Sequence, residues 1–387
     1  MKTNIQYLLV SMLAICGMLT SCTGETPLNN ASGNSSSGKV ILSYSVSNPA
    51  QSRAEDAGWT NFNENKVTRL DLFIFPADNG KVIYYNETFE DNHDAQTGEY
   101  TTWNIPRTSI SPDMLETGDE VYLIANYDFT SPSSIANKSD LDITLRDLDC
   151  DAKQDDFVMT GKAIVNKSNT SNDVTIQVDL IRVAAKICLS FASQTEWNEV
   201  SYRFVHYAQT SALLEENETE HVASQTLSIS PSEDGLTEVN TQTQNLYTDE
   251  GKQKLVLYSY ANDWYKKGES YPNPDVNGGT PMDDDQIYQQ EPIDETKQTY
   301  ILLCAPYNND YYYYKVPVNF RLPENNDDVN IDPDDYKHLY RLQRNYIYDI
   351  TVTIDRAGGS ESEPVTPKLY YQVMLFEEET IDIPAFE

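Results

Sequence analysis

The chain has 387 residues, which is enough for about two domains that each bury a core of their own. Its composition, with 39% hydrophobic and 23% charged residues, is typical of a globular protein and excludes a disordered one. The net charge of -34 repels polyphosphate, so the sequence predicts no nucleic-acid partner and no anionic membrane surface. The 27 tyrosines, set against 11 phenylalanines, favour an extracellular β protein.

The first residues have the features of an export signal. Lys2 supplies the positive charge, residues 7–19 are apolar, and Leu-Thr-Ser-Cys follows at residues 19–22. This ending resembles the bacterial lipobox, in which the cysteine becomes the first residue and is acylated. The resemblance implies a signal peptide over residues 1–21, a lipid on Cys22 and a flexible tether after it. The alternative is an ordinary signal peptidase site with an incidental cysteine.

The first predicted strand follows the tether. Val40, Leu42, Tyr44 and Val46 alternate with less apolar residues, which is the period-two pattern of a half-buried strand. A polar, turn-rich segment comes next and contains the pair Arg53 and Ala54. The sequence thus predicts a good strand on a loose connection.

Several further strands are predicted in the first half of the chain. Residues 67–75 and 81–89 pair as a hairpin around the turn at 76–80, and residues 120–129 are apolar on both faces, as in a central strand. Short helical turns are expected within 111–120 and 139–148. Further strands are expected at 157–166 and 173–191. In the latter the apolar face changes near Ile181 to Lys186, which places a domain boundary there.

The second half contains the same kinds of pattern. Strands are expected within 197–209 and 254–263, a hairpin within 298–322 turns at residues 307–310, and an antiparallel-type strand with one core face lies at 344–354. Glycines and prolines between 358 and 367 break the pattern. The chain then ends on a last strand, in which apolar residues alternate at Leu369, Tyr371, Val373 and Leu375.

Residue patterns for catalysis or metal binding are weak. The serine hydrolase, P-loop and zinc protease motifs are missing from the sequence, so neither an enzyme nor a cofactor is predicted. Asn273, Asp275, Asn277, Gly278 and Asp284 follow part of a calcium-loop pattern, but a solvated acidic loop is preferred because no amphipathic helices flank them. No metal site is predicted. Three cysteines that remain after export, Cys150, Cys188 and Cys304, allow at most one disulfide.

Together the lipobox, Ser52-Arg53-Ala54 after the first strand, LDLFIF, YLIAN, RVAAKI and RNYIYDITVTI resemble the fimbrillin family. These are the type V lipoprotein pilins of Bacteroidales, including the FimA and Mfa1 types. The resemblance implies an all-β fold of two tandem β-sandwich domains, transthyretin-like with Greek-key connections, and few short helices. The implied divisions are a signal at 1–21, a tether and removable strand at 22–53, sandwiches at 54–183 and 184–360, and a donor segment at 361–387.

The resemblance also implies a mode of assembly. An arginine-specific protease would cut between Arg53 and Ala54 and release the strand that carries Val40, Leu42, Tyr44 and Val46. A neighbouring subunit would fill the groove with the strand that carries Leu369, Tyr371, Val373 and Leu375. The implied partners are other fimbrial subunits and, for the precursor, the outer membrane through its lipid. The implied location is a fimbria on the cell surface that serves adhesion.

Alternatives stay open at each step. Arg53 is also readable as an exposed loop arginine, and the last strand as part of its own domain. The whole protein is then a lipid-anchored adhesin or glycan-binding lipoprotein that never polymerises, or an anchor or tip subunit. The run Tyr311 to Tyr314 would suit carbohydrate stacking, but alternation between core and solvent on one strand is the preferred interpretation.

Overall fold

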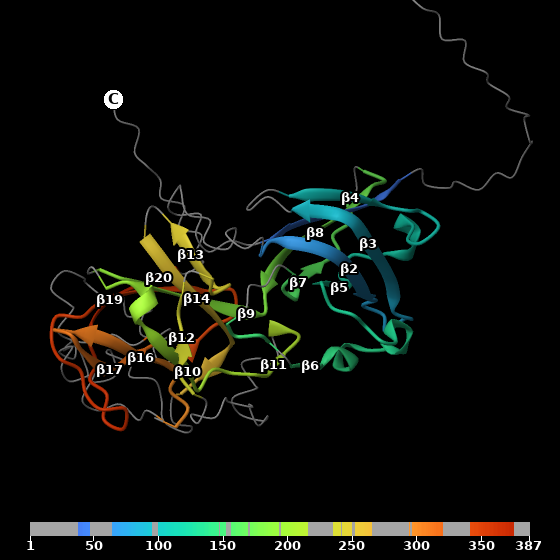
Figure 1. Cartoon of the computed structure of the whole chain (residues 1–387). Helices are drawn as coiled ribbons and strands as arrows, with labels where there is room; N and C mark the ends of the chain where they lie inside the picture. The colour runs from blue at the N-terminus through green and yellow to red at the C-terminus, as the bar shows by residue number, and fades with distance from the viewer. Residues whose placement is uncertain are drawn as a thin grey trace, which may run out of the picture. The chain divides into compact units, whose positions relative to one another are not determined.

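The computed structural model describes residues 38–46, 64–94, 100–146, 148–151, 156–168, 171–192, 195–215, 235–240, 242–249, 252–264, 294, 296–319 and 341–374. Strands dominate these residues, and the predicted all-β fold is confirmed (Figure 1). Short 3-10 turns lie between them, at Pro112–Met114, Pro132–Ser134, Lys138–Leu141 and Trp197–Glu199. The first lies within 111–120, as expected. The third overlaps only the start of the segment 139–148, in which a short helix was expected, and Thr144–Leu145 of that segment form a short strand instead. None of the helices in the described residues is long and apolar enough to cross a membrane.

The first half of the chain forms a seven-stranded sheet with the order β3-β2-β5-β7-β8-β1-β4. Its strands are β1 (Val40–Val46), β2 (Lys66–Phe75), β3 (Ile83–Asp94), β4 (Thr101–Ile105), β5 (Glu120–Ala125), β7 (Met159–Ile164) and β8 (Val174–Arg182). The β2–β3 hairpin is antiparallel, as predicted. β5 lies between β2 and β7 and is buried on both faces, which explains its unbroken apolar sequence.

One hydrophobic core joins all parts of this sheet. Buried side chains of β1 and β8 belong to the same cluster as those of β2 and β5. β8 connects the strands β3-β2-β5-β7 with the strands β1 and β4. It pairs with β7 at two positions only but with β1 along seven. The apolar residues of β8 alternate strictly with exposed ones, so one face of this strand is directed to the core.

The predicted run over residues 173–191 is divided at Val183. β8 ends at Arg182, and β9 (Ala184–Phe191) begins a different sheet in which each of its residues is buried. The change of apolar face at Ile181 to Lys186 thus marks the passage of the chain from one sheet to another. The domain bounds expected around this point stay a prediction.

Two further sheets form a sandwich in the second half. The five-stranded sheet has the order β13-β14-β9-β19-β20, and the four-stranded sheet has the order β12-β10-β16-β17. Their further strands are β10 (Ser201–Val205), β12 (Thr237–Glu238), β13 (Leu246–Asp249), β14 (Lys252–Tyr260), β16 (Tyr300–Tyr307), β17 (Asp310–Pro317), β19 (Ile347–Thr353) and β20 (Lys368–Met374). Both sheets contribute to one buried core. β6 (Thr144–Leu145) pairs with β11 (Ser211–Ala212), and β15 (Asn262–Asp263) pairs with β18 (Arg341–Leu342).

Two details of this half test the sequence patterns. The β16–β17 hairpin turns through Asn308 and Asn309, whose φ angles of 50° and 71° suit the tight turn that was predicted. On β17 Tyr314 is fully buried whereas Tyr311 is 60% exposed, so the predicted alternation is confirmed. The antiparallel pairing expected for residues 344–354 is wrong on one side: β19 is antiparallel to β20 but parallel to β9.

Candidate strand-exchange site

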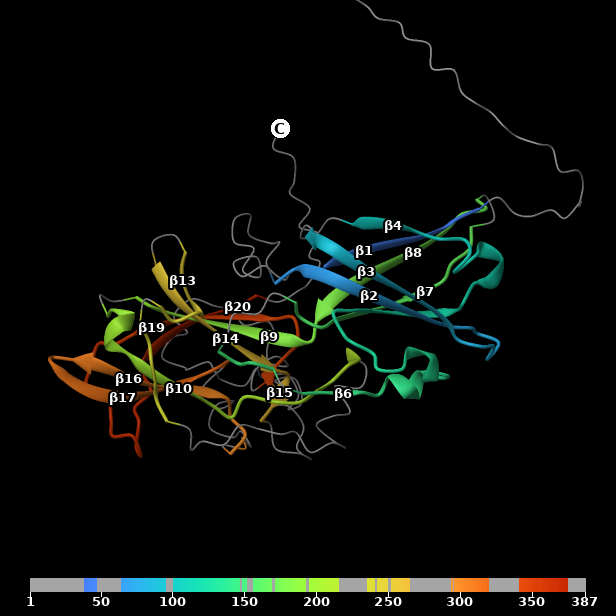
Figure 2. The same cartoon turned by 45° about the vertical axis from the view of Figure 1, so that its right-hand side comes forward.

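β1 lies inside the seven-stranded sheet, between β8 and β4 (Figure 2). It pairs in parallel with β8 along all seven of its residues and antiparallel with β4 from Val40 to Tyr44. The side chains of Val40, Leu42, Tyr44 and Val46 are each 0% exposed and belong to the core. The structure therefore brings together the four residues predicted for the first strand, and all four contribute to the core.

Polar contacts fix the register of β1. The backbone N–H of Lys39 donates to Asp173 Oδ1 at 2.7 Å, and the N–H of Val174 donates to the carbonyl of Lys39 at 2.8 Å. At the other end the Ser45 hydroxyl donates to Asp179 Oδ1 at 2.6 Å. The same oxygen accepts a hydrogen bond of 2.7 Å from the hydroxyl of Tyr100. Asp179 is thus a hydrogen-bond acceptor directed at whichever residue occupies the place of Ser45.

The hydroxyl of Tyr44 is a weakness in this otherwise apolar contact. It is buried and has no hydrogen-bond partner in the part of the chain that the structure describes. Burial raises the pKa of Tyr44 to about 12, as expected for a phenol removed from water. An unsatisfied buried hydroxyl costs about 1 to 3 kcal/mol. The apolar side chains of β1 are therefore well buried, but one polar group of the strand, the Tyr44 hydroxyl, lacks a hydrogen bond to any described residue.

Removal of β1 would leave a groove with two open edges. β8 would lose its partner along seven residues and β4 along five, so backbone donors and acceptors would be exposed on both sides. One side of the groove would be formed by Val174, Ile176, Val178 and Leu180 of β8, which are at most 3% exposed with β1 in place. Four apolar side chains returned to this groove would contribute roughly 6 to 12 kcal/mol before association costs. Such a groove is suited to an added extended strand.

The chain order makes β1 separable from the rest of the fold. β1 precedes all other strands of the described chain, and residues 47–63 connect it to the segment before β2. Arg53 and Ala54 are in this connection and lie outside the described residues, as do Cys22 and the rest of the expected signal and tether. A cut between Arg53 and Ala54 would leave β1 held by non-covalent contacts alone.

A buried ionic cluster fixes the chain on the far side of the connection. Glu64 and Lys186 are fully buried, and their side chains form an ion pair of 2.8 Å. The Tyr258 hydroxyl also donates to Glu64. Burial raises the pKa of Glu64, and the nearby Lys186 opposes that shift. Arg182 donates from Nη1 to Asn345 Oδ1 at 2.9 Å, and burial lowers its pKa to about 9, so it stays charged at neutral pH.

This cluster was missed in the sequence. The segment RVAAKI carries Arg182 and Lys186, but Glu64 stands within a polar stretch that resembles a loop. Glu64 meets its partners Lys186 and Tyr258 only in the tertiary structure, where β9 and β14 lie next to the chain just before β2. The contacts hold the chain at Glu64 without any contribution from β1, so the fold after residue 64 has its own attachment to the core.

The last described strand, β20, lies at the edge of the five-stranded sheet. It pairs antiparallel with β19 of the same chain, from Ile347 with Met374 to Thr353 with Lys368. Leu369 is 2% exposed and belongs to the second core. Tyr371 and Val373 are placed by this backbone pairing, and Leu375 lies outside the described residues. The structure thus has three of the four expected donor residues, Leu369, Tyr371 and Val373, in an edge strand of their own chain.

The connection before β20 covers the edge of β17. The N–H of Tyr313 donates to the carbonyl of Gly359 at 3.1 Å, and the N–H of Lys315 donates to that of Val365 at 3.1 Å. A Cβ on Gly358 would lie 2.6 Å from the carbonyl oxygen of Tyr313, so glycine permits this close approach. β20 is therefore reached through a segment that is itself attached to the opposite sheet.

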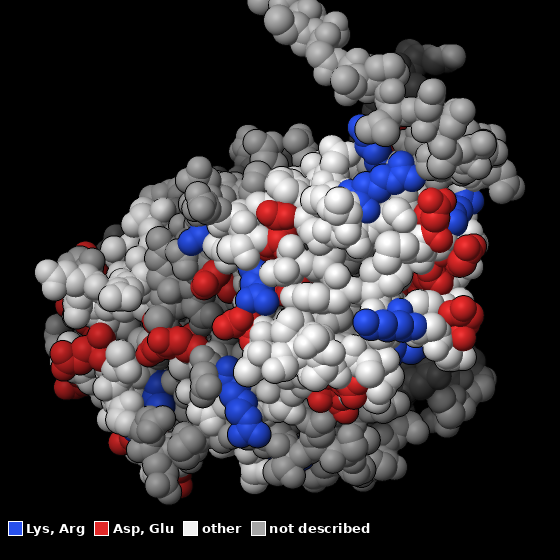
Figure 3. Space-filling model, turned by 90° about the vertical axis from the view of Figure 1, so that its right-hand side faces the viewer, with Lys and Arg blue, Asp and Glu red and all other residues white. Residues whose placement is uncertain are grey.

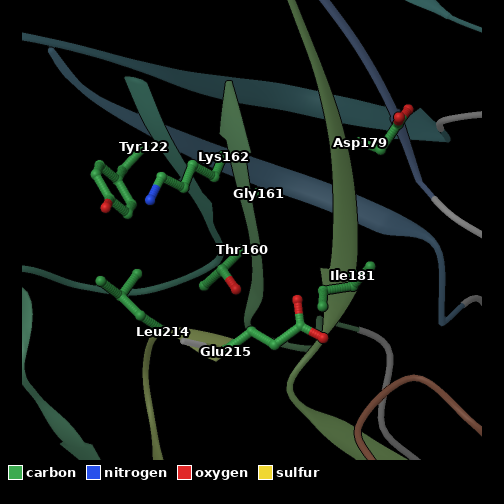
Figure 4. A pocket seen from close by; sticks show the side chains of 8 residues that line it. All are labelled: Tyr122, Thr160, Gly161, Lys162, Asp179, Ile181, Leu214 and Glu215. Carbon is green, nitrogen blue, oxygen red and sulfur yellow. The ribbon is translucent and has the colours of Figure 1, made fainter. Parts of the chain in front are cut away.

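A cavity of about 490 Å³ lies where β7 and β8 separate, close to the β1 contact. Its lining includes Tyr122, Lys162, Asp179 and Glu215 (Figure 4). Lys162 lies over the Tyr122 ring, with Nζ 5.2 Å from the centroid, and this ring is nearly buried. The ring face is thus occupied and is not a platform for stacking a sugar. The cavity shares Asp179 with the contact that fixes β1.

Several charged side chains of the described residues form ion pairs. Figure 3 shows that some basic side chains lie next to acidic ones on this face. Glu120, for example, forms ion pairs with Lys138 at 2.8 Å and with Lys162 at 3.6 Å. Exposed pairs of this kind contribute up to about 1 kcal/mol each, so they bear on solubility more than on the fold.

The described residues contain no group of three or more His, Cys, Asp or Glu that is arranged to hold a metal ion. Cys150, Cys188 and Cys304 are free thiols, and burial raises the pKa of Cys188 to about 12. A buried, protonated thiol is a small apolar group and not a nucleophile. The partial calcium-loop pattern from Asn273 to Asp284 lies outside the described residues.

A comparison with models of known protein families agrees with the resemblance found in the sequence. Residues 37–203 match the family of the major fimbrial subunit protein (FimA). The tip fimbrial protein Mfa3 of Porphyromonas gingivalis, in a C-terminally truncated form, is 12% identical, with a TM-score of 0.47 and coverage of 87% of this chain and 100% of that one. A proposed cell adhesion protein of Bacteroides eggerthii is 14% identical, with a TM-score of 0.44 and coverages of 87% and 95%.

The fimbrial anchor protein Mfa2 of Porphyromonas gingivalis is 8% identical, with a TM-score of 0.36 and coverage of 88% of this chain and 100% of that one. These are distant likenesses. The search of curated proteins finds no match. The matched family is one of structural fimbrial subunits and not of enzymes. The predicted resemblance to the fimbrillin family is therefore confirmed over residues 37–203, which match the model of the major fimbrial subunit.

Proposed function

We propose that the protein is a structural subunit of a cell-surface fimbria that polymerises by donor-strand exchange. It would be exported as a lipoprotein acylated at Cys22 and cut after Arg53 by an arginine-specific protease at the outer membrane. The place of β1 supports this proposal best. β1 is an interior strand with four fully buried apolar side chains, yet one chain connection alone ties it to the rest of the fold.

This arrangement has a physical consequence that suits assembly. An interior strand that leaves opens two edges and an apolar trough together, and a strand from another subunit satisfies both. Because the donor and the groove are different surfaces, their contact is head to tail and continues into an open-ended filament. The donor would be the C-terminal segment with Leu369, Tyr371, Val373 and Leu375.

A second candidate function has one observation in its favour. β20 pairs with β19 of its own chain, and Leu369 contributes to its own core. A subunit whose last strand stays internal would end a filament or remain a lipid-anchored adhesin. To polymerise, the subunit must release β20 from an edge position, where it pairs with one of the described strands, β19.

N-terminal sequencing and gel mobility of protein collected from surface filaments separate the two candidates. A mature terminus at Ala54 together with high-mass ladders supports polymerisation. Monomers that retain an acylated Cys22 would contradict it. The untreated precursor, kept in cells that lack arginine-specific protease activity, serves as the control because it retains β1.

A further inference from the structure

β1 and β20 contain the same short motif. Residues 42–46 read LSYSV and residues 369–373 read LYYQV, so both strands have the pattern Leu-x-Tyr-x-Val. Of the 27 tyrosines in the sequence, Tyr44 and Tyr371 are the two with a leucine two residues before them, and both have a valine two residues after. The two strands lie in different sheets, so their likeness does not follow from a shared set of neighbours.

In β1 this motif is what contacts the core. Leu42, Tyr44 and Val46 are each 0% exposed, and their ladder partners on β8 are Ile176, Val178 and Leu180. The groove between β8 and β4 is therefore shaped for a leucine, a tyrosine and a valine at alternate positions, in that order and direction.

We infer that the groove accepts the C-terminal strand of a second copy of this chain in the direction and register of β1. Leu369, Tyr371 and Val373 take the places of Leu42, Tyr44 and Val46. This assignment rests on the proposed function and adds the direction and register of the donor. Pro367 then stands at the first position of the strand, in the place of Val40, where the missing N–H of proline is tolerated.

Other registers fit the groove less well. If Leu369 took the place of Val40, Tyr371 would replace Leu42 and Val373 would replace Tyr44. That would overfill one position of the core and leave a cavity at another. The reverse direction keeps a tyrosine at the place of Tyr44 but exchanges leucine and valine on both sides of it. The register of the motif leaves all three side-chain volumes unchanged.

The polar residue of β1 at Ser45 agrees with the same register. This register places Gln372 where Ser45 stands, opposite Asp179. Asp179 Oδ1 accepts a hydrogen bond of 2.6 Å from Ser45 in β1, and the side-chain amide of glutamine supplies an equivalent donor. Tyr370 then stands in the place of Ser43, opposite Gln177, at a position that is half-buried in β1 and bordered by the exposed side of β8.

Disulfide cross-linking in filaments of the full-length, exported chain tests the register. Facing residues on adjacent strands have Cα separations that suit a disulfide. The variant with Gln177→Cys and Tyr370→Cys is expected to form a covalent ladder on a non-reducing gel. The matched variant with Gln177→Cys and Gln372→Cys is expected to form none, because residue 372 faces Gln177 only in the two rejected arrangements. Each single variant controls for the native cysteines.

The outcomes separate the register from the proposed function. A ladder with residue 372 and not with residue 370 would overturn the register while leaving donor-strand exchange in place. Filaments that form without a ladder in either variant would show that the C-terminal strand is not the donor, which would overturn both.

A second pair of variants covers the case in which the cysteine variants do not assemble. Gln372→Glu places a carboxylate opposite Asp179 and is expected to lower filament yield about tenfold, since like charges directly opposite destabilise a strand pair. Asp179→Asn in the same chain is expected to restore the yield. Met374→Glu, which faces Asp179 only if Leu369 stands in the place of Val40, is the control. Rescue of Met374→Glu and not of Gln372→Glu would contradict the inference.

Discussion

β1 and β20 are strands of the same length and with the same apolar alternation, at opposite ends of the described chain, but they hold different positions. β1 is an interior strand with partners on both sides, whereas β20 is an edge strand that pairs, among the described strands, with β19 alone. Loss of an interior strand opens two edges and a core face, and loss of an edge strand opens one. Removal of β1 therefore exposes more backbone and core than removal of β20, so β20 is the strand that is released more easily.

The strongest test of this comparison removes one strand at a time. Deletion of β1 is expected to lower the free energy of unfolding by about 6 to 12 kcal/mol, because four fully buried side chains are lost. That is close to the total stability of an ordinary domain, so the deleted protein should aggregate or unfold. Truncation after Pro367 should leave a soluble subunit with a cooperative melting transition that cannot extend a filament.

Denaturant unfolding and filament assays measure both effects. If truncation after Pro367 unfolds the subunit, the last strand is an indispensable part of its own core and the difference between the two strands is lost. A truncation after Met374, which keeps all of β20, is the matched control.

The buried ion pair next to the connection that follows β1 should have the next largest effect. Glu64→Gln leaves the Lys186 charge buried without its partner and is expected to lower the free energy of unfolding by about 3 to 5 kcal/mol. Partly exposed Glu120, which also pairs with lysine, is the control: Glu120→Gln should change stability by less than about 1 kcal/mol.

Chemical denaturation of both variants gives the comparison. If Glu64→Gln and Glu120→Gln cost the same, Glu64 does not hold the segment before β2. The variant with Glu64→Gln and Lys186→Met should recover part of the loss, since it removes both charges.

Gly161 tests the point where β7 and β8 separate. A Cβ at this position would lie 2.3 Å from the carbonyl oxygen of Asp179, so Gly161→Ala must push β8 away. We expect a loss of about 1 to 3 kcal/mol in the free energy of unfolding and a weaker hold on β1. Gly235→Ala, where a Cβ meets nothing within 4 Å, is the control. A neutral Gly161→Ala in thermal denaturation would show that β8 moves freely there.

The smallest predicted effect has a positive sign. Tyr44→Phe removes a buried hydroxyl that has no partner among the described residues, so it should raise the free energy of unfolding of the uncut chain by about 1 kcal/mol. Tyr314 is equally buried, but its hydroxyl donates to the carbonyl of Arg356 at 2.9 Å. Tyr314→Phe should therefore lower stability by about the same amount. Two shifts of the same sign in calorimetry would contradict this contrast.

Much of the fold could be predicted from the sequence because a strand and its turn produce a pattern among neighbouring residues. The period-two pattern of β1 and β8, the asparagines between β16 and β17, and the apolar run of β5 each depend on residues that are close together in the chain. The fimbrillin resemblance was readable for the same reason, from short strand motifs in order. The Glu64 cluster was not, because its members come from residues 64, 182, 186 and 258 and no local pattern links them.

By itself, the sequence determined that the chain is all-β, in which segments its main strands lie, and which face of a strand such as β1 or β8 is apolar. The tertiary structure decided which strands are neighbours: β1 beside β8 in parallel, β19 parallel to β9, and β20 on β19 of its own chain. The physical reason is that alternation reports one buried face. Partner, direction and register depend on backbone hydrogen bonds and packing between distant residues, which no single strand encodes.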